Sequence, residues 1–137
     1  MNELVDELRE LNEDRFSSME LPTIDDLVII EEQILIPLPA EFKEFLMNVS
    51  DVVYGHLEPV TVSDSNLHTY LPEVASVAWD RGMPREYIPI CQVGNDYYCV
   101  EQDGTVLFWR DGTIQEQHWD SVWQWVKEVW LDQTNEF

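Results

Sequence analysis

Basic residues are scarce in this chain. Seven lysines and arginines stand against 28 aspartates and glutamates, which gives a formal charge of -21 at pH 7. Such a surface repels nucleic acid and anionic lipid, so neither is an expected partner, and it accelerates encounter with a cationic protein. A basic protein partner is one interpretation of this charge. The simple solubility of a small acidic domain is the other.

Cysteine and histidine are too few and too scattered to suggest a metal site. The two cysteines, Cys91 and Cys99, form no Cys-x-x-Cys motif, and none of the three histidines has a partner at metal-ligand spacing. Both cysteines fall inside predicted strands, where thiols are typically buried and unreactive. We therefore expect no metal and no cysteine nucleophile.

Targeting and catalytic motifs are missing as well. The first residues are too acidic for a signal peptide and no apolar run could span a bilayer, which favours a cytoplasmic protein with free thiols. The sequence has no glycine-rich phosphate loop, nucleophile elbow or His-Glu-x-x-His motif. We expect no cofactor and no enzymatic activity. An enzyme that uses Glu31 or Glu101 is the distant alternative, and it requires an elevated carboxylate pKa in a pocket.

The apolar content is sufficient for one folded domain. The 137 residues are 45% hydrophobic, so we treat residues 1–137 as a single domain with one core. Apolar spacing predicts helices over residues 2–16, 24–34, 39–49, 70–81 and 121–132. Runs that favour β structure occupy residues 57–62, 87–93, 97–101, 106–110 and 113–116. This order predicts an α+β fold: an antiparallel β-meander with helices packed on one face, N-terminal helices and a closing C-terminal helix.

Short turns that contain glycine separate the last four β runs. Two of these turns contain Asp-Gly, a strong hairpin signal because the turn needs positive φ. In the first turn, a two-residue loop at 94–95 would place Cys91 opposite Tyr98, whereas a three-residue loop at 94–96 would place Cys91 opposite Cys99. The sequence leaves both registers open.

Six tryptophans can serve either the core or an interface. Trp123 and Trp130 are seven positions apart on one face of the predicted closing helix, where core packing is expected. The burial of Trp109, Trp119 and Trp125 is open, and an aromatic side chain among acids is a good anchor for a protein interface. Base stacking would use the same residues but also needs more lysine and arginine than this chain has.

Residues 31–46 are the stretch around which the chain is organised. Pro37 and Pro39 cannot both lie inside one helix, so the helix must break there, and Pro39 suits the start of the next helix. Four apolar residues then align on one helical face: Phe42, Phe45, Leu46 and Val49.

This stretch resembles the hallmark of the SUKH superfamily, the Smi/Knr-type domain. The hallmark is a glutamate near a helix end, seven residues before Leu-Pro, followed by an aromatic-containing helix. The matching residues are Glu31, Leu38, Pro39, Phe42, Phe45 and Leu46. The later segments 87–90, 94–96 and 100–101, the strand that ends at Trp109 and the segment 121–123 also look like the family. The resemblance covers about residues 22–132 and leaves residues 1–16 as an extra N-terminal helix.

Three positions depart from the family pattern. Leu35 stands where glycine is common before the corner, Ser50-Asp51 stands where Asn-Gly is usual, and Glu101 replaces a common aspartate. The first two concern turn geometry, and the third keeps a carboxylate.

The resemblance implies an α+β fold without enzymatic activity. Most bacterial members are immunity proteins that bind and neutralise a cognate toxin of an intercellular competition system, very often a nuclease. An acidic chain independently fits this role, because nuclease clefts are basic. The alternative is a non-immunity interaction module or scaffold regulator that binds a cellular protein.

We expect the partner to bind the exposed face and turns of the sheet. The candidate residues, chosen from charge and turn position, are Asp96, Glu101, Asp103, Trp109, Asp111, Glu116, Trp119 and Asp120. The family-signature residues are expected to be structural, and Glu31 is expected to satisfy hydrogen-bond donors near the corner.

Overall fold

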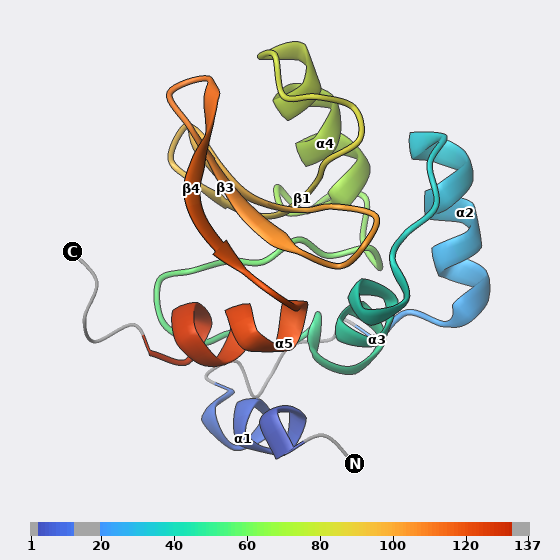
Figure 1. Ribbon diagram of the computed structural model, residues 1–137. Helices are drawn as coiled ribbons and strands as arrows, with labels where there is room; N and C mark the ends of the chain where they lie inside the picture. Colours follow the sequence, from blue (N-terminus) through green and yellow to red (C-terminus); the bar gives the residue numbers. More distant parts are fainter. Residues whose placement is uncertain (1–2, 13–19, 133–137) are drawn as a thin grey trace.

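The computed structural model describes residues 3–12 and 20–132 (Figure 1). The first helix, α1, spans Glu3–Leu11 and buries Val5 and Leu8. Arg9 holds α1 against the end of α3 (Ala40–Val49), because its guanidinium donates to the Asn48 carbonyl at 2.7 Å and lies 2.8 Å from Asp51 Oδ1. The predicted cap at residue 2 and the predicted helix end near residue 16 lie outside the described residues.

The second helix, α2, spans Ile24–Ile34, as predicted. It begins there because Thr23 and Asp26 form a reciprocal capping box: the Thr23 hydroxyl accepts from the Asp26 N–H at 3.2 Å, and the Asp26 carboxylate accepts from the Thr23 N–H at 2.8 Å. Helix α3 follows the two-proline break, with Pro39 as its N-cap. The fourth helix, α4, spans Leu71–Asp80, within one residue of its prediction at each end.

A four-stranded antiparallel sheet in the order β1-β2-β3-β4 confirms the predicted α+β fold with its β-meander. Its strands are Ile88–Val93, Asp96–Val100, Val106–Arg110 and Thr113–Trp119. The last strand runs beyond its predicted end at residue 116, because a register shift between Leu107 and Trp109 lets the longer strand keep its pairing.

The first hairpin has a two-residue turn. Val93 pairs with Asp96 and Cys91 pairs with Tyr98, while Cys99 pairs with Pro89. Successive residues of a strand point to opposite faces, so the two cysteines lie on opposite faces of the sheet. This register selects one of the two alternatives that the sequence left open.

The predicted strand at residues 57–62 is wrong. The segment makes three isolated bridges, Leu57 with Tyr54, Pro59 with Cys91 of β1, and Thr61 with Tyr70 before α4. Pro59 has no N–H to donate, and the three bridges connect the segment to different neighbours, so no continuous ladder forms.

The closing helix has two parts. Ser121 caps α5 (Val122–Trp125) by accepting from the Gln124 N–H at 3.0 Å, and a π-helical turn, η1 (Val126–Trp130), follows. Five-residue spacing in a π-turn puts Trp125 and Trp130 on the same side, and both are fully buried. The expectation that Trp123 shares the core with Trp130 is therefore right only in part. Trp123 is half-buried and donates its Nε1–H to Glu44 Oε1 at 2.6 Å.

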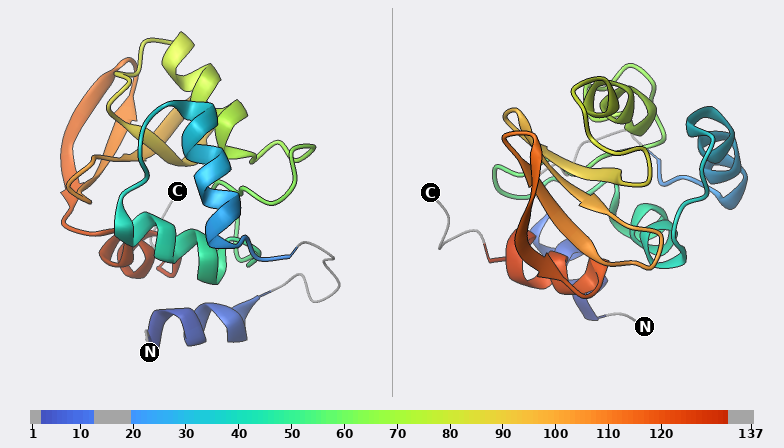
Figure 2. Two further views of the ribbon diagram at one scale, coloured as in Figure 1. Left: turned by 90° about the vertical axis from the view of Figure 1, so that its right-hand side faces the viewer. Right: turned by 45° about the horizontal axis from the view of Figure 1, so that its top comes forward.

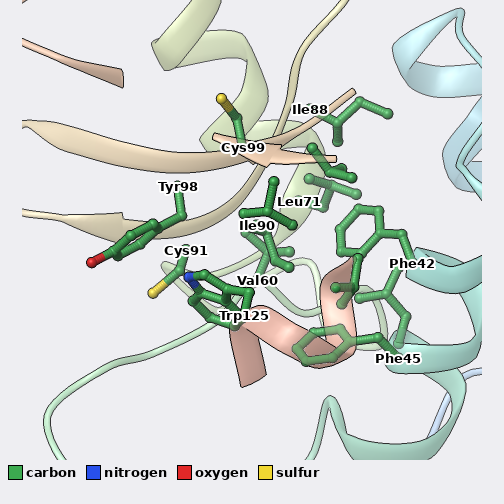
Figure 3. Packing of buried hydrophobic residues seen from close by; sticks show 14 of the residues in the cluster. Phe42, Phe45, Val60, Leu71, Ile88, Ile90, Cys91, Tyr98, Cys99 and Trp125 are labelled. Carbon is green, nitrogen blue, oxygen red and sulfur yellow. The ribbon is translucent and has the colours of Figure 1, made fainter. Parts of the chain in front are cut away.

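The core lies between the sheet and the helices (Figure 3). Phe45 of α3 stacks on Phe42 and meets Trp125 of α5, and the Trp125 ring contacts Tyr98 of β2 edge-on at 5.5 Å between centroids. Helix α4 packs beside β1, and α2 stands outside α4 at the periphery of the molecule (Figures 1 and 2). Among the described residues, no helix is long and apolar enough to cross a membrane.

Candidate functional site

The corner after α2 uses its glutamate to hold the fold together. Glu31 Oε2 accepts from the Leu38 N–H at 2.7 Å and lies 3.4 Å from Lys43 Nζ. This confirms that Glu31 satisfies donors near the corner. The apolar signature residues Leu38, Phe42, Phe45 and Leu46 are buried, between 0% and 4% exposed. The stretch that defines the sequence pattern is therefore built into the core and offers little to a ligand.

The predicted acidic surface is divided between the two ends of the sheet. In a meander, alternate turns lie at opposite ends, so the turns 94–95 and 111–112 lie together and the turn 101–105 lies apart. Asp96 and Asp111 belong to the first end, where Asp96 Oδ1 accepts from the Asp111 N–H at 3.4 Å. Glu101 and Asp103 belong to the second end. The structure does not bring all the candidate acids into one site.

Carboxylates gather around Glu101 at the second end, which we call the Glu101 cluster: Glu86, Glu101 and Asp103. Burial raises the pKa of Glu101, and the negative charges of Asp103 and Glu86 raise it further. Asp103 is fully exposed, and a hydrogen bond from the Thr105 N–H at 2.9 Å lowers its pKa. Like charges thus act on Glu101 without a cation among the described residues to lower its pKa, which is the arrangement expected of a surface that meets a cationic partner.

The Glu101 cluster adjoins the corner after α2. Gln102, at the tip of the same turn, donates its Nε2–H to the Pro37 carbonyl at 2.8 Å, across 65 positions of sequence. The side chain of Arg85 reaches the Ile34 carbonyl at the end of α2 at 2.9 Å. These bonds connect the β2–β3 turn and the segment before β1 to the end of α2 and the corner that follows it.

Five of the six described cations, Arg9 among them, have partners outside the Glu101 cluster. Lys43 pairs with Glu31, and Arg85 also lies over the Trp79 ring at 4.1 Å from its centroid. Arg81 reaches Asn95 Oδ1 at 3.4 Å, so a cation lies near the first end of the sheet. Arg110 Nε lies 3.8 Å from Asp111 Oδ2 at that same end. The first end is therefore partly neutralised, whereas the Glu101 cluster is not.

The two remaining candidate acids lie on and after β4. Glu116 is exposed on the strand, and Asp120 is exposed just before α5. Asp120 Oδ1 lies 3.6 Å from His118 Nε2. Both acids face solvent, outside the Glu101 cluster.

Neither candidate tryptophan is available at the surface. Trp109 and Trp119 are each 4% exposed. Trp109 packs against Tyr97 at 5.8 Å between ring centroids, and Trp119 packs against Tyr98 at 5.5 Å. They are core residues, so an apolar anchor has to come from other side chains.

Features of catalysis are weak in the part of the chain that the structure describes. Among these residues, no three histidine, cysteine, aspartate or glutamate side chains are placed so that they could hold a metal ion. Burial raises the pKa of both Cys91 and Cys99 to about 12, which keeps the thiols protonated. A hollow of about 600 Å³ lies beside the loop after α3, and His68 at its rim hydrogen-bonds Glu58 at 3.1 Å. It lies away from Glu31, and the Glu101 cluster is not part of its lining.

An exposed apolar face on α2 was missed by the sequence analysis. Only Leu27, Ile30 and Ile34 of this helix are buried, while Ile24 is 54%, Val28 47% and Ile29 51% exposed. Leu35, the C-cap, is 78% exposed and adopts the left-handed conformation at φ 66°. For leucine this conformation costs about 1–2 kcal/mol. The available signal was a helix with aliphatic residues on both sides, together with a leucine at a position that favours glycine.

Comparisons with known proteins agree with the fold. A family model described as SMI1-KNR4 cell-wall, SUKH_5, matches residues 1–131. A crystal structure of a protein from Pseudomonas syringae pv. tomato is 60% identical, with a TM-score of 0.92, over 96% of this chain and 98% of that chain. A search of curated proteins gave no match. The match to nearly the whole chain, together with the Glu31 corner and the meander, shows that this chain belongs to the SMI1-KNR4 family of the SUKH superfamily.

Proposed function

We propose that this chain is an immunity protein. It binds a cognate, basic protein toxin of an intercellular competition system, a nuclease in our proposal, and neutralises it by stoichiometric occlusion of the toxin's active-site cleft. It acts in the cytoplasm of the cell that makes it and performs no catalysis of its own. Membership of the SUKH superfamily is compatible with this role.

The observation that carries the proposal is the Glu101 cluster. Burial and the negative charges of Asp103 and Glu86 raise the pKa of Glu101, and no cation among the described residues lowers it. A cationic surface that docks there removes this repulsion and gains the Coulomb energy of new ion pairs. A nuclease cleft offers such a surface because it is built to hold phosphates. Among the candidate acids, Glu101 and Asp103 form the centre of the proposed contact, and Asp96, Asp111, Glu116 and Asp120 contribute to long-range attraction.

Co-expression tests this function. The neighbouring gene, taken as the toxin candidate, is induced with and without the immunity candidate, and growth is followed. We expect rescue by the wild-type chain, and a one-to-one complex in calorimetry that weakens steeply as salt rises from 50 to 500 mM. Absence of both rescue and complex at low salt would sink the proposal.

A second candidate function is regulation of a cellular protein. The cell-wall description of the matching family favours it, because that wording points to members outside toxin immunity. It predicts a stable complex with a host protein and no rescue from the toxin. A shallow salt dependence of that complex supports this alternative, since an uncharged partner gains little from the acidic field.

A further inference from the structure

The outward side of α2 exposes aliphatic side chains that the fold does not use. We call this the outer α2 face: Ile24, Asp25, Val28, Ile29, Glu32 and Leu35. Ile24, Val28 and Leu35 follow one another at helical spacing along one side, and Ile29 lies on the other side of Asp25 and Glu32. The aliphatic residues are between 47% and 78% exposed. The helix stands at the periphery of the molecule (Figures 1 and 2), and its buried residues Leu27, Ile30 and Ile34 lie on its other side.

These residues do not serve the stability of the isolated chain. β-branched side chains at exposed helical positions are poorer helix formers than alanine, leucine, lysine or glutamate. Leu35 combines two costs, since it holds a left-handed conformation that glycine adopts freely and it leaves a large apolar group in water. Strain and exposure at one residue indicate a role outside the folded monomer.

The charges on this face identify the kind of partner. Asp25 and Glu32 are exposed between the two groups of aliphatic residues, and α2 contains no lysine or arginine. Glu32 also lies near the C-terminal end of the helix, where the helix dipole disfavours an acid. A second copy of this chain would bring the same acids against each other. A cationic partner instead pairs with them and covers the aliphatic groups.

We propose that the outer α2 face is the apolar docking site for a cationic protein segment, with Leu35 as its central anchor. The segment presents leucine-like or aromatic side chains flanked by lysine or arginine. The Gln102–Pro37 hydrogen bond joins the turn that carries Glu101 and Asp103 to the chain two residues after Leu35, so one partner can reach both. The identification of the partner as the toxin rests on the proposed function. The location of the docking site and the chemistry of the segment that binds it do not.

The decisive variant is Leu35→Gly, because it separates stability from binding. Glycine adopts the left-handed conformation without strain, so we expect a higher urea midpoint of unfolding. Loss of the Leu35 side chain should weaken binding of the cationic partner about tenfold. Unchanged affinity in this variant overturns the inference. A drop in both stability and affinity also overturns it, because a merely structural role for Leu35 would then explain the loss.

Two matched charge variants distinguish a direct contact on the outer α2 face from the effect of the chain's overall negative charge. Val28→Lys places a cation on the outer α2 face, and Val53→Lys adds the same charge at an aliphatic residue 42% exposed in a loop. We expect Val28→Lys to weaken binding about tenfold and Val53→Lys to change it less than about twofold. Equal losses would mean that only the net charge matters, and would overturn the docking site.

Two probes keep the inference distinct from the proposed function. The first is a synthetic amphipathic peptide of leucine and lysine, titrated into the isotopically labelled chain. We expect NMR shift changes concentrated in residues 24–35, and changes centred elsewhere overturn the inference.

The second probe is the toxin encoded by the neighbouring gene, measured by calorimetry with the same variants. If the toxin binds all variants equally, the inference falls and the function stands; if the wild type ignores the toxin but the peptide maps to α2, the function falls and the inference stands.

Light scattering tests the competing occupant. We expect a monomer up to millimolar concentration, at low and high salt. A dimer that Val28→Lys dissociates would show that a second copy covers the outer α2 face, and would overturn the cationic partner.

Discussion

The corner after α2 and the β2–β3 turn lie side by side, and each presents a glutamate, yet the two carboxylates have opposite surroundings. Glu31 meets a backbone N–H and a lysine. Glu101 meets two further carboxylates and partial burial, which raise its pKa. The same residue type therefore stabilises the fold in one place and stores electrostatic repulsion in the other. What surrounds a charge, more than the charge itself, separates a structural acid from a candidate binding acid.

Removing Glu31 should produce the largest effect on stability. In Glu31→Ala the part-buried Leu38 N–H loses its acceptor, so we expect the free energy of unfolding to fall by about 2 kcal/mol. Urea denaturation at pH 7 measures this change. The neighbouring Glu32→Ala should stay within about 0.5 kcal/mol of wild type, because Glu32 is exposed. Equal losses in the two variants would contradict the structural assignment of Glu31.

Reversing a charge in the Glu101 cluster should affect binding more than folding. We expect Glu101→Lys to weaken the complex with the cognate toxin about tenfold, or about 1.4 kcal/mol, since it replaces an attraction by a repulsion. Calorimetry at low salt measures the affinity. Glu116→Lys carries the same charge change on exposed β4 and should lose less. A larger loss for Glu116→Lys would move the contact from the β2–β3 turn to the sheet face.

The pH dependence of stability should carry a smaller signature of Glu101. Its pKa is raised in the folded chain, so the folded state binds more protons than the unfolded state around the ordinary glutamate range. The contribution of Glu101 to stability is therefore largest at low pH and falls as the pH rises through that range. We expect Glu101→Gln to remove this fall and to raise stability at pH 7 by about 0.5 kcal/mol or less, because partial exposure screens the charges.

Urea midpoints between pH 3.5 and 7 measure the difference between wild type and Glu101→Gln. Asp103→Asn is the contrasting variant, because the pKa of Asp103 is lowered. In Asp103→Asn the Thr105 N–H loses its charged acceptor. This loss opposes the gain in stability at pH 7 that comes from weaker repulsion on Glu101. A wild-type curve identical in shape to that of Glu101→Gln would contradict the clustered arrangement.

The smallest effect is expected when the native chain is treated with a reagent that alkylates its two cysteines. Burial, with the charge of Glu101 as a second cause, raises the pKa of Cys99 to about 12, and burial raises that of Cys91 to about 12. The native chain should therefore resist alkylation by iodoacetamide at pH 8, and both thiols should react once urea unfolds it. Mass spectrometry counts the modified cysteines. Rapid labelling of Cys99 in the native chain would mean that the turn opens.

Local signals predicted the helices and turns that have their own chemistry. The Thr23–Asp26 capping box fixes the start of α2, and Asp-Gly fixes the turn at 111–112, where Asp111 and Gly112 both take positive φ. The segment at 57–62 has suitable residues for a strand, but its pairing depends on neighbours distant in sequence. The π-helical turn that buries Trp125 in place of Trp123 also has no local signal, because packing against Tyr98 and Phe45 selects it.

The candidate site was harder to predict for a geometric reason. Charge and turn position selected the acids one by one, but a meander sends alternate turns to opposite ends, so Asp96 and Glu101 separate. Burial of Trp109 and Trp119 depends on side chains from β2 that pack against them. Glu31 was easier, because a carboxylate beside a two-proline break has free backbone N–H groups within reach. The outer α2 face left a signal in the sequence, aliphatic residues on both sides of the helix, but which side is buried became known only from the structure.

The hydrogen bond between Gln102 and Pro37 has a kinetic consequence. It joins the β2–β3 turn to the corner after α2 and so restricts the movement of the acids relative to the aliphatic residues. A partner that docks there has little of this chain to order, which lowers the entropic penalty of association. The negative field then sets how quickly the partner arrives, and the apolar contacts set how long it stays. Substitutions at Leu35 should therefore shorten the lifetime of the complex while leaving its rate of formation nearly unchanged.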